Sequence, residues 1–201
     1  MNTPASHANP AAIILAAGAS HRLGQPKQLV TYNNGETLIQ RSIRIVTEAG
    51  ASPVIVVLGA NAAQIRKIIP VVPSIHIIEN ESWSEGMASS IRTGIAALRQ
   101  YSPHAQSTLI LACDQPSVTA DHLHQLFATS NNGRNAVAST YANRRGIPAI
   151  FPSTIFSQLE QLTRDTGARE ILQAHDLLTV PLEDGDFDID TLSDLARLQR
   201  M

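Results

Sequence analysis

The chain has 201 residues, of which 43% are hydrophobic and 16% charged, with a formal net charge of -2. This length and balance favour one globular domain with a sizeable core and exclude a disordered chain. The slight negative charge, without a dense basic patch, excludes the usual electrostatic basis for a nucleic-acid partner. The single cysteine, Cys113, excludes an internal disulfide framework, and its apolar surroundings predict a packed small side chain rather than a nucleophile.

The N-terminal residues predict a loose tail that leads into a buried strand. Residues 1–10 are rich in Pro, Asn, Ser and Ala, so we expect the domain to span 11–201. The apolar run 11–17 is too short to cross a bilayer, has no basic segment before it and is followed at once by polar residues. We therefore expect neither a signal peptide nor a membrane partner, and we interpret the chain as cytoplasmic.

A polar loop follows that strand at Gly18 and carries two cations, Arg22 and Lys27. Glycine lets the backbone approach an anion, while exposed N–H groups and fixed positive charge neutralise it. The loop matches neither G-x-x-x-x-G-K-S/T nor G-x-G-x-x-G, the two commonest nucleotide fingerprints. It is either a polyphosphate loop of another kind or an ordinary turn between a strand and a helix with surface charges.

Short apolar runs alternate with helical patterns along the rest of the chain. We expect strands at 53–58, 74–79, 107–112, 135–140, 146–151 and 177–181, and helices at 36–49, 61–69, 87–100, 119–130, 165–174 and 191–200. The alternation predicts an α/β fold: a single-domain, doubly wound, mainly parallel sheet with helices on both faces. The loops after 17, 58 and 112 then meet at the carboxyl edge, where such sheets bind ligands.

Two polar segments at that edge carry ambiguous signals. Asn61 follows the second strand, where capping a helix is its commoner role and binding a ligand the alternative. Gly86, Ser89 and Ser90 begin a helix whose N–H and hydroxyl groups suit a base, ribose or phosphate. Any well-capped helix looks the same, so this segment by itself favours the structural interpretation.

Asp114 and an acidic run near the C-terminus are candidate ligands for Mg²⁺. Asp114 follows the 107–112 strand directly and is held by Pro116, which suits metal binding, although turn chemistry also accepts Asp there. The acidic run 184–194 lacks the glycine and terminal glutamate that a calcium loop requires. A single carboxylate from this run completing a site with Asp114 is the sharper hypothesis, and a plain helix start favoured by the dipole is the alternative.

The order of these segments resembles the molybdenum cofactor cytidylyltransferase family of nucleotidyltransferases, over residues 11 to 197. The matching motifs are Leu15-Ala16-Ala17-Gly18-x-Ser20-x-Arg22-x-Gly24-x-Pro26-Lys27-Gln28-Leu29, then Asn80…Trp83…Gly86-Met87-x-Ser89-Ser90, Asp114-Gln115-Pro116, Arg145-Gly146-x-Pro148-x-x-Phe151, Gly167-Ala168-Arg169 and Asp188-Ile189-Asp190-Thr191.

The resemblance implies roles for these residues. A nucleotide site would comprise Leu15, Ala16, Ala17, Gly18, Ser20, Arg22, Lys27, Asn61, Gly86, Ser89, Ser90 and Asp114, and an acceptor site Arg145, Gly146, Pro148, Gly167 and Arg169. Arg22, Lys27 and Asp114 would be catalytic, and Asp114 and Asp190 would hold Mg²⁺. Ala17 favours CTP, because guanylyltransferase relatives typically carry Leu-Ala-Gly-Gly at this point.

The implied reaction moves CMP from CTP to the terminal phosphate of molybdenum cofactor and releases pyrophosphate. One alternative keeps the fold but uses GTP or a sugar phosphate. Another is a maturation chaperone that binds the cofactor and delivers it to a molybdoenzyme client; the retained lysine and both aspartates argue against it.

Overall fold

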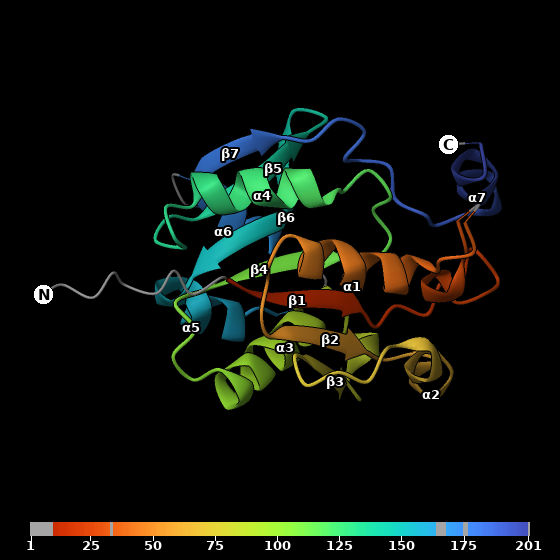
Figure 1. Cartoon of the computed structure of the whole chain (residues 1–201), viewed down its shortest axis with the longest axis horizontal. Coiled ribbons are helices and arrows are strands. Elements are labelled where there is room, and N and C mark those ends of the chain that lie inside the picture. Colours follow the sequence, from red (N-terminus) through yellow and green to blue (C-terminus); the bar gives the residue numbers. More distant parts are fainter. Residues whose placement is uncertain (1–9, 33, 164–167, 175–176, 201) are drawn as a thin grey trace, which may run out of the picture.

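The structure, a computed structural model, describes residues 10–32, 34–163, 168–174 and 177–200. The described residues form a seven-stranded sheet of order β3-β2-β1-β4-β6-β5-β7 (Figure 1). The strands are β1 (Ala11–Ala16), β2 (Val54–Leu58), β3 (Ile75–Glu79), β4 (Ser107–Ala112), β5 (Val137–Tyr141), β6 (Arg144–Pro152) and β7 (Leu178–Pro181). The helices and 3-10 turns are η1 (Lys27–Leu29), α1 (Leu38–Glu48), α2 (Ala62–Ile65), η2 (Arg66–Ile68), η3 (Trp83–Glu85), α3 (Met87–Tyr101), α4 (Ala120–Thr129), η4 (Ser153–Ile155), α5 (Phe156–Glu160), α6 (Arg169–Ala174) and α7 (Leu192–Leu198).

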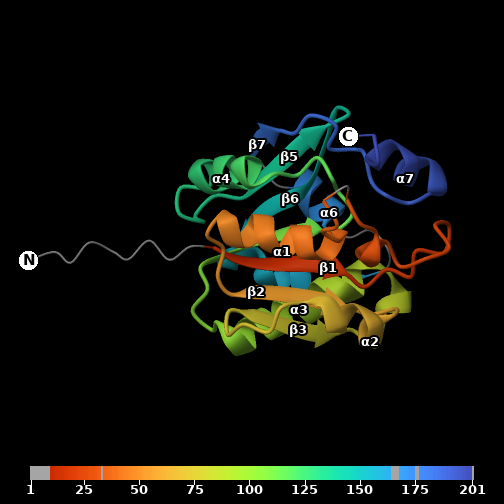
Figure 2. The same ribbon diagram turned by 45° about the vertical axis from the view of Figure 1, so that its right-hand side comes forward.

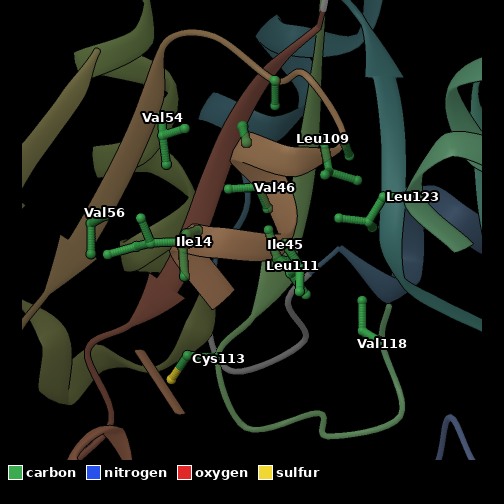
Figure 3. Packing of buried hydrophobic residues seen from close by; sticks show 14 of the residues in the cluster. Ile14, Ile45, Val46, Val54, Val56, Leu109, Leu111, Cys113, Val118 and Leu123 are labelled. Atoms are coloured by element: carbon green, nitrogen blue, oxygen red, sulfur yellow. The ribbon is translucent and has the colours of Figure 1, made fainter. Parts of the chain in front are cut away.

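The central strands β1, β2 and β4 are parallel to one another and buried on both faces. Helices α1 and α4 cover one face, while α3 and α5 cover the other (Figure 1). Figure 3 shows Ile14, Val56 and Leu111 of the strands gathered with side chains of α1 in the first of these two cores. Because both faces are covered, the strands are apolar throughout rather than alternating. The predicted doubly wound α/β architecture is confirmed.

Local features explain how the helices begin and how closely they pack. A capping box begins α1: the Thr37 hydroxyl faces the Gln40 N–H, and the Gln40 side chain accepts from the Thr37 N–H. Gly94 lets α3 lie against β1, since a Cβ there would come within 2.6 Å of Ile13. Cys113 is only 3% exposed, and burial, followed by the charge of Asp114, raises the pKa of its thiol to about 12.

The sheet is mixed in its second half. Strand β6 runs antiparallel to both β4 and β5, whereas β7 runs parallel to β5. Only Ala142 and Asn143, both with positive φ, connect β5 to β6, and a two-residue hairpin requires antiparallel strands. The expectation of a mainly parallel sheet is therefore confirmed, with β6 as its antiparallel member.

Most expected elements are present with shifted ends. The expected helix 61–69 is divided between α2 and η2. The expected helix 165–174 corresponds to α6, and 164–167 lie outside the described residues. Helix α5 was not expected, because five residues give too little periodicity to recognise.

The C-terminal segment returns to the carboxyl edge of the sheet. Leu23 and Val30, from the loop after β1, pack with Phe187, Ile189 and Leu198. Figure 2 shows α7 on the same side of the molecule as this loop. Within the described ranges, no helix is long and apolar enough to span a membrane.

Candidate active site

The loop after β1 is held in shape by the segment that carries Lys27. Gln28 is fully buried, and its amide donates to the carbonyl oxygens of Ala16 and Gly18 at 2.8 and 3.0 Å. The Lys27 N–H donates to the Ser20 hydroxyl at 3.1 Å, and Ser20 has a positive φ of 57°. The first and last residues of the loop are thus joined by hydrogen bonds, which fixes the backbone from which the Lys27 side chain extends.

Lys27 lies between the two aspartates that the sequence singled out. Its ammonium donates to Asp114 and, at 2.8 Å, to Asp190. Arg22 pairs with the other oxygen of Asp190 at 2.9 Å. The structure therefore brings together four predicted site residues that come from positions as far apart as 22 and 190.

Backbone and side-chain bonds connect the two aspartate-bearing segments. The Ile189 N–H donates to the Asp114 carbonyl at 3.0 Å. The amide of Gln115 donates to the Gly185 carbonyl at 3.2 Å, and the Ser117 hydroxyl to that of Asp184 at 2.8 Å. The convergence of the carboxylates is thus built into the fold rather than left to side-chain rotamers.

Helix α1 holds the loop after β4 in place through Arg41. Arg41 donates to the carbonyl oxygens of Pro116 and Val118 at 2.8 and 2.6 Å. Burial lowers the pKa of its guanidinium, but a group with an ordinary value above 12 stays charged. Arg41 is a structural cation of the site that the sequence reasoning missed, because a helical arginine is usually a surface residue.

The charges at the site are strongly coupled. Burial disfavours the Lys27 ammonium, yet the charge of Asp114 and the hydrogen bonds that the ammonium donates to both aspartates outweigh it and hold the pKa of Lys27 above its ordinary value. Burial, and next the negative charge of Asp114, raises the pKa of Asp188 to about 7. Asp188 belongs to the motif Asp188-Ile189-Asp190-Thr191 but not to the predicted site residues. The sequence feature that could have identified it is its position two residues before Asp190, in a run with aspartates at every second residue.

A cavity of about 600 Å³ lies beside this charged cluster. Three of the predicted acceptor residues, Arg145, Gly146 and Arg169, line it. Pro148 is buried and is not among its lining residues, and Gly167 lies outside the described residues. Sequence reasoning missed several further lining residues: Gln115, Tyr141, Arg144 and Asp188.

Tyr141 lines this cavity and explains why residue 146 is a glycine. Its hydroxyl donates to the Ile147 carbonyl at 3.0 Å, and a Cβ on Gly146 would lie 2.0 Å from the hydroxyl oxygen. Gly146 is therefore needed because the Tyr141 ring occupies the space of a side chain. A larger hollow of about 830 Å³ lies between α1 and the η2–β3 region, but none of the predicted site residues line it.

The serine hydroxyls at the start of α3 form hydrogen bonds with groups of the protein itself. Asn80 is buried and donates to the hydroxyls of Ser89 and Ser90 at 2.8 and 3.1 Å. Gly86 begins the helix with φ of 100°, and the Ser89 hydroxyl donates to its carbonyl. These hydroxyls are engaged within the protein and shape the helix start.

The remaining predicted nucleotide residues lie at or near the same edge. Leu15, Ala16 and Ala17 are buried at the end of β1, and the Ala17 carbonyl accepts from the Ala60 N–H at 3.0 Å. Asn61 takes the N-cap position of α2 in the left-handed region, without a side-chain capping bond. Its side chain is exposed.

The donor set suits a hard divalent cation. Two carboxylates converge on one cation position, which Lys27 fills here, and Mg²⁺ is commonly held by one or two carboxylates together with substrate phosphates. Among the residues that the structure describes, no group of three or more His, Cys, Asp or Glu side chains is arranged to hold a metal. Asp114 and Asp190 therefore fit a metal that shares its coordination with a phosphate ligand.

The model of the MobA-like NTP transferase domain matches residues 12–179. The chain belongs to this family. It is thus assigned to the nucleotidyltransferases, and the family suggested by the sequence motifs is confirmed at this level.

Known proteins of two kinds are similar to this nucleotidyltransferase. Nicotine blue oxidoreductase of Paenarthrobacter nicotinovorans is 31% identical over 92% of this chain and 94% of its own length. Molybdenum cofactor cytidylyltransferase of Escherichia coli K12 is 26% identical over 90% of this chain and 91% of its own.

A solved structure of Rv0371c from Mycobacterium tuberculosis H37Rv has a TM-score of 0.80 at 26% identity and covers 96% of this chain and 99% of its own. A second structure of Rv0371c, a complex with manganese, has a TM-score of 0.76 at 25% identity and covers 96% and 98%.

Proposed function

We propose that this nucleotidyltransferase transfers CMP from CTP to the terminal phosphate of molybdenum cofactor and releases pyrophosphate. The observation that carries the proposal is the convergence of Lys27, Asp114 and Asp190 next to a cavity that three arginines line. A cation cluster for a triphosphate and a basic cavity for a second phosphate are what a transfer between two phosphorylated substrates needs.

In this reaction an oxygen of the acceptor phosphate forms a bond to the α-phosphorus of CTP. The bond from that phosphorus to the bridging oxygen breaks, and pyrophosphate leaves with the electron pair. The acceptor phosphate is already ionised near neutral pH, so no strong general base is required. Catalysis then consists of positioning and neutralising charge on the phosphoryl oxygens.

Each group of the site has a role in this scheme. Arg22 and Lys27 bind the triphosphate and stabilise the departing pyrophosphate. The loop held by Gln28 and the start of α3 enclose the nucleoside, with Ala17 as the residue that favours cytosine. Arg145 and Arg169 draw the phosphorylated pterin into the cavity.

Asp114 and Asp190 would hold Mg²⁺, which supplies neutralisation of the reacting phosphate and orients it for attack. The manganese complex of Rv0371c supports a divalent cation in this family. The similarity to molybdenum cofactor cytidylyltransferase supports the choice of acceptor and nucleotide.

The similarity to nicotine blue oxidoreductase favours a second candidate function, an oxidoreductase activity on nicotine blue. The loop after β1 lacks the G-x-G-x-x-G fingerprint of dinucleotide-binding enzymes, which argues against it. Following the colour of nicotine blue with and without a reductant distinguishes this candidate from nucleotidyl transfer.

The experiment that tests the proposal measures pyrophosphate release from CTP, GTP, ATP and UTP, with and without molybdenum cofactor. We expect release from CTP that depends on the cofactor and on Mg²⁺. Preference for GTP would overturn the role of Ala17. Cofactor binding without pyrophosphate release from any nucleotide would favour the maturation chaperone.

A further inference from the structure

The carboxylates proposed to hold a divalent cation already face two cations of the chain itself. Lys27 contacts one oxygen of Asp114 and one of Asp190, and Arg22 contacts the second oxygen of Asp190 at 2.9 Å. The side chains of Lys27 and Asp114 are only 15% and 14% exposed. Two positive and two negative charges thus form a balanced group that is enclosed at Lys27 and Asp114 and open to solvent at Arg22.

We propose that Lys27 occupies the divalent-cation position between Asp114 and Asp190, so that the metal and Lys27 compete for the same carboxylates. Nucleotide binding relieves the competition, because the triphosphate offers Lys27 and Arg22 new anionic partners. Metal and nucleotide therefore bind cooperatively, and the metal by itself binds weakly. This inference rests on the proposed function for the metal-binding role of the two aspartates and for the identity of the nucleotide.

The competition between Lys27 and the divalent cation is electrostatic. An ammonium and a divalent cation a few ångströms apart repel each other strongly where solvent is largely excluded, so they cannot share two carboxylates. Displacing Lys27 without a replacement partner would leave a partly buried ammonium unpaired, which is costly. A triphosphate removes that cost, and by linkage the metal then strengthens nucleotide binding by the same factor.

The local structure permits the lysine to change partners. The backbone of Lys27 is fixed by the hydrogen bond of its N–H to Ser20 and by the burial of the neighbouring Gln28. Its ammonium lies at the end of a flexible four-carbon stem, so it reaches different anions from one fixed Cα. Arg22 is 72% exposed and turns toward a phosphate without disturbing the core.

The test measures Mn²⁺ binding to the full chain without nucleotide, from the electron paramagnetic resonance signal of free Mn²⁺. We expect Lys27→Met, which keeps the stem and removes the charge, to bind Mn²⁺ at least ~10-fold more tightly than the unaltered protein, because one favourable charge pair is worth about 1.4 kcal/mol or more in an enclosed site. Lys67→Met, at an exposed lysine on η2, is the matched control and should bind as the unaltered protein does.

Three further variants locate the effect and guard against a variant that does not fold. Arg22→Gln should strengthen Mn²⁺ binding less than Lys27→Met does, since Arg22 is exposed and touches one carboxylate only. Adding Asp114→Asn to Lys27→Met should abolish the gain, which places the gain at this pair. If Lys27→Met does not fold, Lys27→Arg provides the second test: it keeps the charge and should bind Mn²⁺ as weakly as the unaltered protein.

Equal or weaker Mn²⁺ binding by a folded Lys27→Met would overturn the competition, as would much tighter binding by Lys27→Arg. Because this assay contains neither nucleotide nor acceptor, its outcome is separate from that of the pyrophosphate assay. Failure of the transferase proposal would leave the metal result standing, and the reverse also holds.

Discussion

The backbone N–H of Ile189 donates a 3.0 Å hydrogen bond to the carbonyl of Asp114. This bond ties the loop after β4 to a segment 75 residues later in the chain, next to the two carboxylates that contact Lys27. The side chains of Gln115 and Ser117 extend the same connection to carbonyls of 184–185. The site is therefore a product of tertiary structure, although each of its parts follows a separate strand or turn.

Removing one carboxylate should slow the reaction far more than it alters the fold. We expect Asp114→Asn to lower turnover by ~10²–10³-fold, the scale found for one preorganised electrostatic group. Pyrophosphate release at saturating CTP and Mg²⁺ measures it. Asp121→Asn, at an exposed aspartate in the first turn of α4, is the control and should keep normal turnover. Near-normal turnover of Asp114→Asn would remove Asp114 from the catalytic machinery.

Gln28 should matter for stability as well as for nucleotide binding. Gln28→Leu removes the donor to the Ala16 and Gly18 carbonyls; the bond to Ala16 is buried, whereas Gly18 is exposed, so that water can replace the lost donor there. A buried acceptor left without a partner costs about 1–3 kcal/mol. Urea denaturation measures the free energy of unfolding, and we expect a loss of about 1–3 kcal/mol from the unpaired Ala16 carbonyl. Gln64→Leu, at an exposed glutamine in α2, should change it by less than about 0.5 kcal/mol. A loss no larger than that of Gln64→Leu would show that the two bonds contribute little.

Gly146→Ala should weaken acceptor binding and spare CTP. The added Cβ would lie 2.0 Å from the Tyr141 hydroxyl oxygen and 2.6 Å from the adjoining ring carbon, so the ring must move within the cavity. Overpacking of this kind costs about 1–3 kcal/mol of folding free energy. The displaced ring occupies space where the acceptor would bind, and each 1.4 kcal/mol of binding free energy so lost raises the KM for the acceptor about 10-fold. Steady-state kinetics with each substrate varied in turn separates the two KM values. A raised KM for CTP with an unchanged KM for the acceptor would contradict the assignment of this cavity to the acceptor.

His122 should make the protein sensitive to mild acid. It is buried on α4, its Nε2 lies 2.7 Å from the Ser139 hydroxyl, and burial lowers its pKa. Because the unfolded chain binds the proton more readily, the stabilisation is complete above the unfolded pKa of about 6.5 and is lost as pH falls through the folded pKa. The slope from this one group is at most about 1.4 kcal/mol per pH unit.

Urea denaturation between pH 5 and about 7.5 measures this slope. His122→Gln should flatten it, whereas His124→Gln, at an exposed histidine of the same helix, should leave it as it is. An unchanged slope in His122→Gln would assign the acid sensitivity to other groups.

Much of the fold follows from local pattern, whereas the positions of single side chains do not. Strands such as β1 and β4 are apolar throughout because helices cover both faces, so their existence and edge were predictable. The antiparallel course of β6 was not, since it depends on the two-residue turn at Ala142 and Asn143 rather than on periodicity.

The residues of the site also differ in how far the sequence could predict them. Lys27 and Asp114 follow strand ends and were predictable from their positions, and Asp190 required the family resemblance. Arg41 acts through hydrogen bonds to carbonyls about 75 residues away in the chain, and no spacing in the sequence distinguishes it from a surface residue. For Ser89 and Ser90 the segment itself favoured a structural role, and their hydroxyls accept hydrogen bonds from Asn80, while the nucleotide role implied by the resemblance stays a prediction.

The most direct test of nucleotidyl transfer follows the α-phosphate itself. CTP radiolabelled at the α-phosphate is incubated with Mg²⁺, molybdenum cofactor and the enzyme, and the label is traced by chromatography. We predict that the label moves to the cofactor in equal amounts with pyrophosphate, and that Asp114→Asn makes this product ~10²–10³-fold more slowly. Label that remains in CTP, while label from GTP or another nucleotide moves to an acceptor, would contradict the account.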